Sequence, residues 1–245
     1  MCRNLVLVLG DQLDQSSAAF DDVDKAQDVI WMAEVAEEST HVWTHKARIV
    51  LFLSAMRHFR DHLFDDGFTV DYQEISEKKK AREPMSLAAA LQSSLNRLEK
   101  KGLKPNRLIC VEPGEWRVRV ALEEAAKDAG ISLEVRPDRH FFTTGDDFSE
   151  HAAGRKQLRL EFFYRPLRER FNILMDEGEP AGGQWNYDAD NRGSFGKSGP
   201  EKLRPPKRFK PDALTHAVIN LVSKRFQKHP GSLEQFDWPV TKKDA

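Results

Sequence analysis

The chain has 245 residues and a mass of 28.1 kDa, which suits one large domain or one domain with an extension. Hydrophobic residues make up 40% and charged residues 31%, and no apolar run approaches the ~20 residues that a membrane-spanning helix needs. The only cysteines, Cys2 and Cys110, exclude a four-cysteine zinc or iron–sulfur site within the chain, and residues 1–15 lack a secretory cleavage pattern. We therefore expect a cytoplasmic protein without membrane association.

The net charge of −1 at pH 7 is unevenly distributed along the chain. Residues 151–245 contain 18 lysines and arginines against 12 acidic residues, whereas residues 1–150 contain 20 against 27. A basic C-terminal part suits contact with a polyanion, but a solvated, lysine-rich surface explains the same distribution at least as well.

Residues 1–136 alternate between short apolar runs and segments of helical periodicity. The pattern predicts strands at 5–9, 28–33, 69–72, 108–111 and 131–135, and helices at 45–64, 86–98 and 115–129. Gly67, Gly102 and Gly130 follow the three helices, as glycine often does at a helix C-terminus. This alternation indicates an α/β fold, a Rossmann-like five-stranded parallel sheet with helices on both faces.

After Asp138 the alternation stops. Residues 155–175 predict one basic, aromatic, amphipathic helix, residues 178–211 are dense in glycine, proline and charge, and a final helix is expected at about 215–226. We therefore divide the chain into an α/β domain, 1–136, and a helical and irregular interdomain segment, 137–245.

Acidic residues follow the predicted strands. In an open parallel sheet, ligands bind beyond the carboxyl ends of the strands. There the sequence places Gly10–Leu13, Glu34–His45 and Glu112–Glu115, and with them the carboxyl groups of Asp11, Glu34, Glu38 and Glu112. Such acids suit a neutral heterocycle with N–H and hydroxyl donors better than a polyphosphate, which needs glycine amides and cations. The alternative is that these acids only form turns and helix ends.

Other catalytic or metal patterns are weaker. The chain contains no glycine-rich phosphate loop, GxSxG elbow or CxxC pair. His58 and His62 have the i,i+4 spacing of a metal pair, but exposed helix histidines explain them better. Cys110 lies within an apolar strand and is expected to be inert core. We assign no catalytic residue and no metal ligand.

Aromatic and arginine residues alternate in 159–170, and Trp185, Tyr187 and Arg192 lie in the flexible loop beyond. Such mixtures suit stacking on bases and pairing with phosphates. For the helix, its spacing favours aromatics buried against the sheet with arginines in solvent. For the loop, a Trp and a Tyr among Gly, Asn and Asp need another surface to pack on.

Five segments in matching order resemble the deoxyribodipyrimidine photolyase-related proteins, the bacterial (6-4) photolyases and cryptochromes with an iron–sulfur cluster. They are GDQL at Gly10–Leu13, the stretch Met32–Phe59, EPGEWRV at Glu112–Val118, FFYRPLRER at Phe162–Arg170 and GGQWNYDADNR at Gly182–Arg192. The resemblance implies an N-terminal antenna domain that binds 6,7-dimethyl-8-ribityllumazine. It also implies a C-terminal helical domain with FAD and a [4Fe–4S] cluster, which would start where this chain ends.

The resemblance also implies site residues. Gly10 and Asp11, with the adjoining Gln12, and Glu38 match the antenna pocket, and its candidate walls are Ala33, Glu34, His41 and Phe52. His41 stands where an aromatic such as tyrosine is expected. Phe52 is bulkier than the expected aliphatic residue and would crowd the lumazine if it points inward, so binding is weak or absent in that case. The loop match implies that Trp185, Tyr187 and Arg192 lie near DNA.

The resemblance thus predicts the light-harvesting domain of a DNA-repair flavoprotein, in which the full-length enzyme repairs (6-4) photoproducts. Its expected partners are damaged DNA, through the full-length protein, and the C-terminal FAD domain, and we expect a monomer. Two alternatives remain. One is a stand-alone nucleotide-binding α/β enzyme that uses Asp11 and Glu38, and the other is a DNA-interaction module without catalysis.

Overall fold

The computed structural model describes residues 2–78, 83–188, 192–197, 199–200 and 204–245. The chain divides into two compact units: an α/β unit of residues 1–138 and 208–245, and an intervening unit of residues 139–207. Within the described residues, no helix is both long and apolar enough to cross a membrane.

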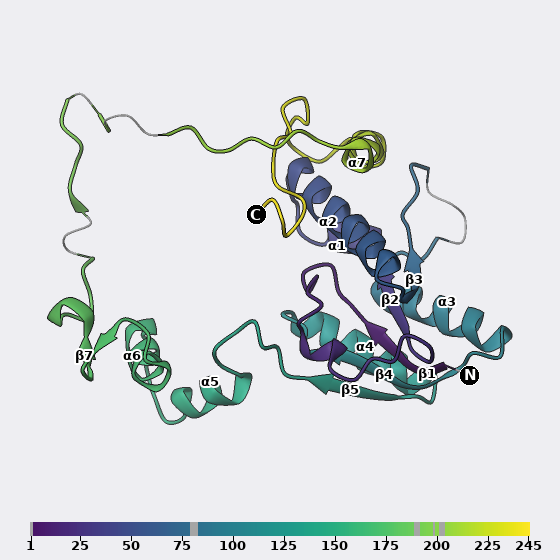
Figure 1. Cartoon of the computed structure of the whole chain (residues 1–245), viewed down its shortest axis with the longest axis horizontal. Helices are drawn as coiled ribbons and strands as arrows, with labels where there is room; N and C mark the ends of the chain where they lie inside the picture. Colours follow the sequence, from purple (N-terminus) through teal and green to yellow (C-terminus); the bar gives the residue numbers. More distant parts are fainter. Residues whose placement is uncertain (1, 79–82, 189–191, 198, 201–203) are drawn as a thin grey trace. The chain divides into compact units, whose positions relative to one another are not determined.

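A five-stranded sheet in the order β3-β2-β1-β4-β5 forms the centre of the α/β unit (Figure 1). All four strand pairs are parallel, which confirms the predicted Rossmann-like fold. The strands are β1 Cys2–Leu7, β2 Val29–Ala33, β3 Thr69–Gln73, β4 Pro105–Val111 and β5 Ser132–Arg136. The chain builds outward from β1 to β3 and then crosses to the other side of β1 for β4. The order therefore reverses between β1 and β4, where open sheets of this kind bind ligands.

Four helices connect the strands: α1 Ala36–Thr40, α2 Lys46–Asp65, α3 Leu87–Lys100 and α4 Trp116–Asp128. A short 3-10 helix, η1 Ala18–Phe20, lies between β1 and β2. The side chains of His45 and Ser86 accept hydrogen bonds from the backbone N–H groups of Ala47 and Ala89, and so cap α2 and α3. The predicted helices therefore begin and end within a few residues of their expected bounds.

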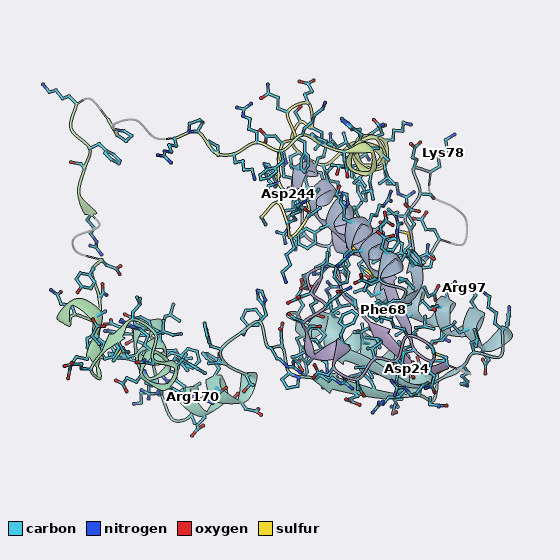
Figure 2. All side chains as sticks on the ribbon, in the orientation of Figure 1. Asp24, Phe68, Lys78, Arg97, Arg170 and Asp244 are labelled. Atoms are coloured by element: carbon cyan, nitrogen blue, oxygen red, sulfur yellow. The ribbon has the colours of Figure 1, made fainter. Side chains whose placement is uncertain are left out.

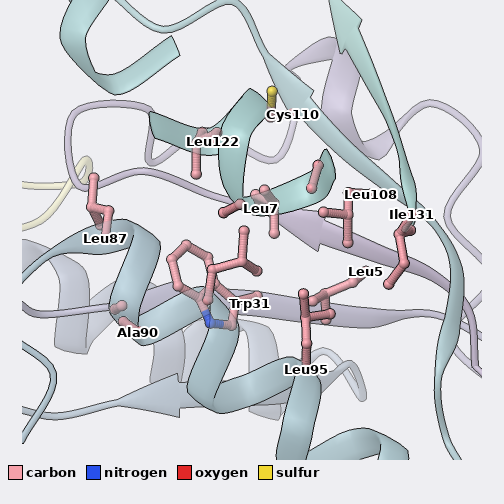
Figure 3. Packing of buried hydrophobic residues seen from close by; sticks show 14 of the residues in the cluster. Leu5, Leu7, Trp31, Leu87, Ala90, Leu95, Leu108, Cys110, Leu122 and Ile131 are labelled. Carbon is pink, nitrogen blue, oxygen red and sulfur yellow. The ribbon is translucent and has the colours of Figure 1, made fainter. Parts of the chain in front are cut away.

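The strand side chains alternate between two layers of core. Leu5 and Leu7 of β1 pack with Trp31 and with the apolar faces of α3 and α4 (Figure 3). Val6 and Val8 face the opposite layer, with α2 and η1. Trp31 is fully buried, so the first layer depends on one large side chain from β2.

The C-terminal part of the chain returns to the α/β unit. Helix α7, Ala213–Arg225, lies beside α2 (Figure 1), and its Val218, Leu221 and Val222 share a core cluster with Ile49 and Leu53. This differs from the expected continuous segment 137–245. The reason is that α2 has apolar residues on two sides, one facing the sheet and one facing α7.

The intervening unit contains α5 Gly145–Ala152 and α6 Leu160–Phe171, with the short elements β6 Met175–Asp176, β7 Glu179–Pro180 and η2 Ala181–Gly183. The predicted single helix 155–175 is shorter than expected, because the backbone of Arg159 is extended just before α6 and that of Asn172 is left-handed at its end. The expectation that its aromatics are buried is wrong, since α6 has no buried residue. Arg170, labelled in Figure 2, pairs with Asp147 of α5 at 2.9 Å.

A substitution at Leu122 tests the packing of α3 and α4 on the sheet. Leu122→Ala should lower the free energy of unfolding by about 2–5 kcal/mol, because Leu122 is fully buried and its truncation leaves a cavity. The matched control, Glu124→Ala on the exposed side of the same helix, should change stability by less than ~0.5 kcal/mol. Urea unfolding of both variants measures the difference, and equal losses would contradict the packing described above.

Candidate binding site at the carboxyl edge of the sheet

A cavity of about 180 Å³ lies where strands β1, β2 and β4 end. Its walls come from the residues that follow these strands, from α1, from α2 and from the first turns of α3 and α4. The site therefore lies beside the reversal of strand order, as the sequence predicts. The cavity is smaller than the ~300 Å³ at the lower end of ordinary ligand pockets, so it suits a ring system rather than a whole dinucleotide.

Four acidic residues line this cavity: Asp11, Glu34, Glu38 and Glu115. Partial burial raises the pKa of Asp11, and the charges of Glu115 and Glu38 raise it further. Glu38 accepts two hydrogen bonds from Arg117, at 2.9 and 3.1 Å, and Arg117 also contacts Glu115 at 3.0 Å. Arg117 therefore neutralises part of this acidic group, whereas Asp11 lines the cavity and forms no ion pair among the described residues.

Glu34 lines the same cavity but has another use. Its buried carboxylate accepts hydrogen bonds from Arg57 at 2.7 and 2.9 Å, from the Tyr72 hydroxyl at 2.6 Å and from the Ile75 backbone N–H at 3.0 Å. Although burial alone would lower the pKa of Arg57, its bonds to Glu34 raise it. The prediction that the Glu34 carboxyl faces the ligand with Asp11 is therefore corrected. Both oxygens of Glu34 already accept hydrogen bonds, from Arg57 of α2, from Tyr72 of β3 and from the backbone just after β3.

The apolar wall is formed by α2. Phe52 is half-buried and lines the cavity, which is the orientation in which its ring would crowd a bound lumazine. Met56 lines the cavity one helical turn further along. A side chain at Gly10 would come within 2.9 Å of the Met56 sulfur, so glycine lets the end of β1 approach α2. The guanidinium of Arg48 lies 5.4 Å from the centre of the Phe52 ring and supplies a positive charge to the same wall.

Three further predicted residues lie outside the lining. Gln12 donates a hydrogen bond to the Glu112 backbone carbonyl at 2.9 Å and so joins the ends of β1 and β4. The Glu112 carboxyl itself pairs with Arg119. His41 is exposed at the C-terminal end of α1, with its backbone N–H bonded to Glu37. The expectation that His41 and Glu112 face the ligand is therefore corrected, whereas Ala33 lines the cavity as expected.

Sequence reasoning did not single out several cavity residues, of which Arg48 and Glu115 carry charge, and it missed Arg117, which pairs with Glu38 and Glu115. One signal was present in the sequence: Arg48 is a basic residue one turn before Phe52, on the helix face that was expected to be apolar. The pairing of Arg117 with Glu38 had no local signal, because the two residues are 79 positions apart.

In the intervening unit, the half-buried Trp185 lies against α6. The guanidinium groups of Arg165 and Arg168 lie 5.4 and 5.1 Å from its ring centre, and its carbonyl accepts a hydrogen bond from the Tyr164 hydroxyl at 3.0 Å. Tyr187 and Arg192 are exposed. The residues Ala189–Asn191 of the matched motif lie outside the described part of the chain.

Cys110 and His58, which the sequence analysis considered as reactive or metal-binding residues, have structural surroundings. Burial raises the pKa of the Cys110 thiol to about 12, which makes it unreactive at neutral pH. His58 lies 3.3 Å from the Asp212 carboxylate, so it joins α2 to the residue that caps α7. No group of three or more potential metal ligands occurs within the described residues.

Comparison with known proteins adds to this geometry. Residues 6–238 match the family described as deoxyribodipyrimidine photo-lyase-related protein. The chain is 41% identical over 242 residues to a (6-4) photolyase of Agrobacterium fabrum (strain C58 / ATCC 33970), covering 98% of this chain and 46% of that relative. It is also 23% identical over 149 residues to uncharacterized protein R852 of Acanthamoeba polyphaga mimivirus, covering 59% of this chain and 69% of that protein.

The chain thus spans less than half of the length of the (6-4) photolyase that it matches. The family match nevertheless extends over the α/β unit, the intervening unit and α7. By the extent of this match and the identity to the (6-4) photolyase, the chain belongs to the deoxyribodipyrimidine photolyase-related protein family.

Proposed function

We propose that the α/β unit is the antenna domain of a photolyase-like protein and that its cavity binds 6,7-dimethyl-8-ribityllumazine. The single observation that carries this proposal is the cavity itself, in which the Asp11 carboxyl faces an apolar wall at the reversal of strand order. A lumazine ring offers N–H and carbonyl groups, and its ribityl chain offers hydroxyl donors. The carboxylates of Asp11 and Glu38 would accept hydrogen bonds from such donors.

The chemistry of the wall suits an uncharged heterocycle. Gly10, Ala33 and Met56 provide close apolar contact, and Arg48 provides a donor for a ring carbonyl. A nucleoside triphosphate would bring several negative charges next to Asp11, Glu38 and Glu115, which opposes binding. We therefore favour the lumazine over the nucleotide of the stand-alone enzyme hypothesis.

The bound lumazine would absorb light and pass the excitation energy to a flavin. This chain's residues would bind and orient the chromophore, which is the usual contribution of a protein to a cofactor reaction. In a longer protein that also contains FAD, the excited flavin would then serve the repair of (6-4) photoproducts in DNA. The Agrobacterium relative is a (6-4) photolyase by name, which supports this substrate.

Asp11 provides the first test of the cavity. The purified chain should bind added lumazine with a change in the ligand's fluorescence, and Asp11→Asn should weaken binding about tenfold, the usual effect of losing a charged hydrogen-bond acceptor worth ~1.5 kcal/mol. Asp65→Asn, at the exposed end of α2, is the matched control and should leave affinity unchanged. Binding of ATP together with no detectable binding of lumazine would contradict the proposal. Glu38→Gln is a less direct test, because it also disturbs Arg117.

The raised pKa of Asp11 predicts the direction in which lumazine affinity changes with pH. Because binding uses the ionised carboxyl, affinity should fall as the pH decreases through a value above the ~3.9 of an ordinary aspartate, and Asp11→Asn should remove this dependence. In the unliganded protein a raised pKa means that ionisation opposes folding, so the stability from the neutral carboxyl is lost as pH rises through that pKa. Asp11→Asn should therefore be no less stable than the wild type at neutral pH.

Phe52 provides the second test. Its ring takes up part of the cavity, so Phe52→Leu should enlarge the space and strengthen lumazine binding about tenfold, equivalent to ~1.4 kcal/mol of relieved overpacking. Phe64→Leu, on the same helix and away from the cavity, serves as the control. Fluorescence titration measures both affinities. Weaker binding by Phe52→Leu would show that the ring stacks on the ligand instead of crowding it.

We further propose that the intervening unit lies near DNA, with Trp185, Tyr187 and Arg192 on the side toward the lesion. Arg192 is exposed and forms no ion pair within the described residues, which leaves its guanidinium open to a phosphate.

Duplex binding by the full chain should therefore fall steeply with salt, and Arg192→Ala should reduce the slope of log affinity against log salt by about 1. Lys104→Ala, which removes a lysine paired with Glu99 on the α/β unit, is the control. Filter binding or anisotropy over a salt series measures the slopes. Binding that is absent or independent of salt would rule out this role.

A further inference from the structure

We propose that His229 is a positioning residue for the cavity, which it holds in shape from outside. The segment that follows α7, Phe226–Gly231, contacts the loop Val42–His45 immediately before α2. We call this contact the C-terminal brace. The inference deepens the proposed function, on which its binding test depends.

The His229 ring forms the centre of the brace. Its Nδ1 lies 3.0 Å from the Thr44 backbone carbonyl oxygen. Since a carbonyl oxygen only accepts, Nδ1 carries the proton and donates it to this bond. One side of the ring stacks on Trp43, with centres 4.9 Å apart and planes 17° apart, and Phe226 meets it edge-on at 5.5 Å. His229 is buried, so the orientation of its ring is closely restricted.

The backbone next to His229 strengthens the brace. The Pro230 carbonyl accepts a hydrogen bond from the Lys46 backbone N–H at 2.9 Å, which satisfies one of the free N–H groups at the start of α2. At Gly231, a side chain would overlap the His45 ring, and the positive φ of 93° also favours glycine. The His45 ring in turn accepts a bond from the Ala47 N–H at 3.0 Å and caps α2.

The loop that the brace holds belongs to the cavity wall. Thr44 lines the cavity, and Arg48, Ile49 and Phe52 line it from the first two turns of α2. With the Thr44 carbonyl bonded to His229, the peptide on that side of the loop cannot rotate without breaking a buried hydrogen bond. The position of these wall residues therefore depends on a segment nearly 200 residues away in the sequence, since His229 and Thr44 are separated by 185 positions.

Helix α7 holds the brace in place. Its Val218, Leu221 and Val222, together with Phe226, share an apolar cluster with Ile49, Val50 and Leu53 of α2. Both sides of the contact thus lie in the α/β unit. All the residues that line the cavity belong to residues 1–138, and the segment that returns after the intervening unit supports their α2 wall from outside the cavity.

Two substitutions in the full chain separate the hydrogen bond from the ring packing. His229→Phe keeps an aromatic ring but loses the donor, and should weaken lumazine binding about tenfold, the effect of ~1.4 kcal/mol. His229→Asn places an amide N–H near the Nδ1 position, and should bind within about threefold of the wild type. Fluorescence titration with 6,7-dimethyl-8-ribityllumazine measures both, and equal affinity of His229→Phe and the wild type would overturn the proposal.

Hydrogen exchange gives a second readout that needs no ligand. His229→Phe should speed exchange of the Lys46 and Ala47 amides while leaving those of α4 unchanged, whereas a general loss of stability would speed both. If His229→Phe fails to fold, Trp43→Ala removes the stacked ring from an exposed position and should speed the same two amides. Unchanged exchange at Lys46 and Ala47 would overturn the brace. If the wild type binds no lumazine while exchange responds as expected, the brace stands and the proposed ligand fails.

Discussion

The buried pair between Glu34 and Arg57 is the interaction on which the site depends. It joins the end of β2 to the middle of α2 through two hydrogen bonds, and the same carboxylate holds Tyr72 of β3 and the Ile75 backbone. A buried charge is tolerated only when it is paired and its lone pairs are satisfied, and removing one partner of such a pair typically costs ~3–5 kcal/mol. The pair therefore holds the middle of α2 against the end of β2, on the helix that also places Phe52 and Met56 at the cavity.

The cavity follows from this geometry. Parallel strands bring their carboxyl ends to one edge, and the reversal of order between β1 and β4 separates the loops that follow. Helix α2 closes the resulting gap from one side, with its N-terminal end held by the C-terminal brace and its middle held by Glu34. Asp11, which follows β1, lines the cavity beside this helix. Its unfavourable ionisation in the unliganded protein is the physical reason why an uncharged donor from a ligand would be stabilised there.

The same acids have three different roles, and the difference is decided by their partners. Glu34 supports the fold, Glu38 is held by Arg117 at the rim, and Asp11 keeps its oxygens available. From the sequence these residues look alike, since each follows a strand and each is a carboxylate. Only the placement of Arg57 and Arg117 distinguishes them. The basic, aromatic helix α6 shows the same effect, because its Arg165 and Arg168 stack on Trp185 within their own unit.

The sequence by itself determined the α/β class, the order of strands and helices, the edge at which the site forms and the family resemblance, because these depend on local periodicity, helix ends and short motifs. The strand pattern also placed Asp11 and Glu38 at this edge, and the family resemblance added Gly10 and Phe52; all four line the cavity. The tertiary structure alone decided that Glu34 supports the fold, that His41 is exposed, and that residues 208–245 return to pack against α2. The physical reason is that each of these depends on contacts between residues far apart in the chain, and local periodicity carries no information about such contacts.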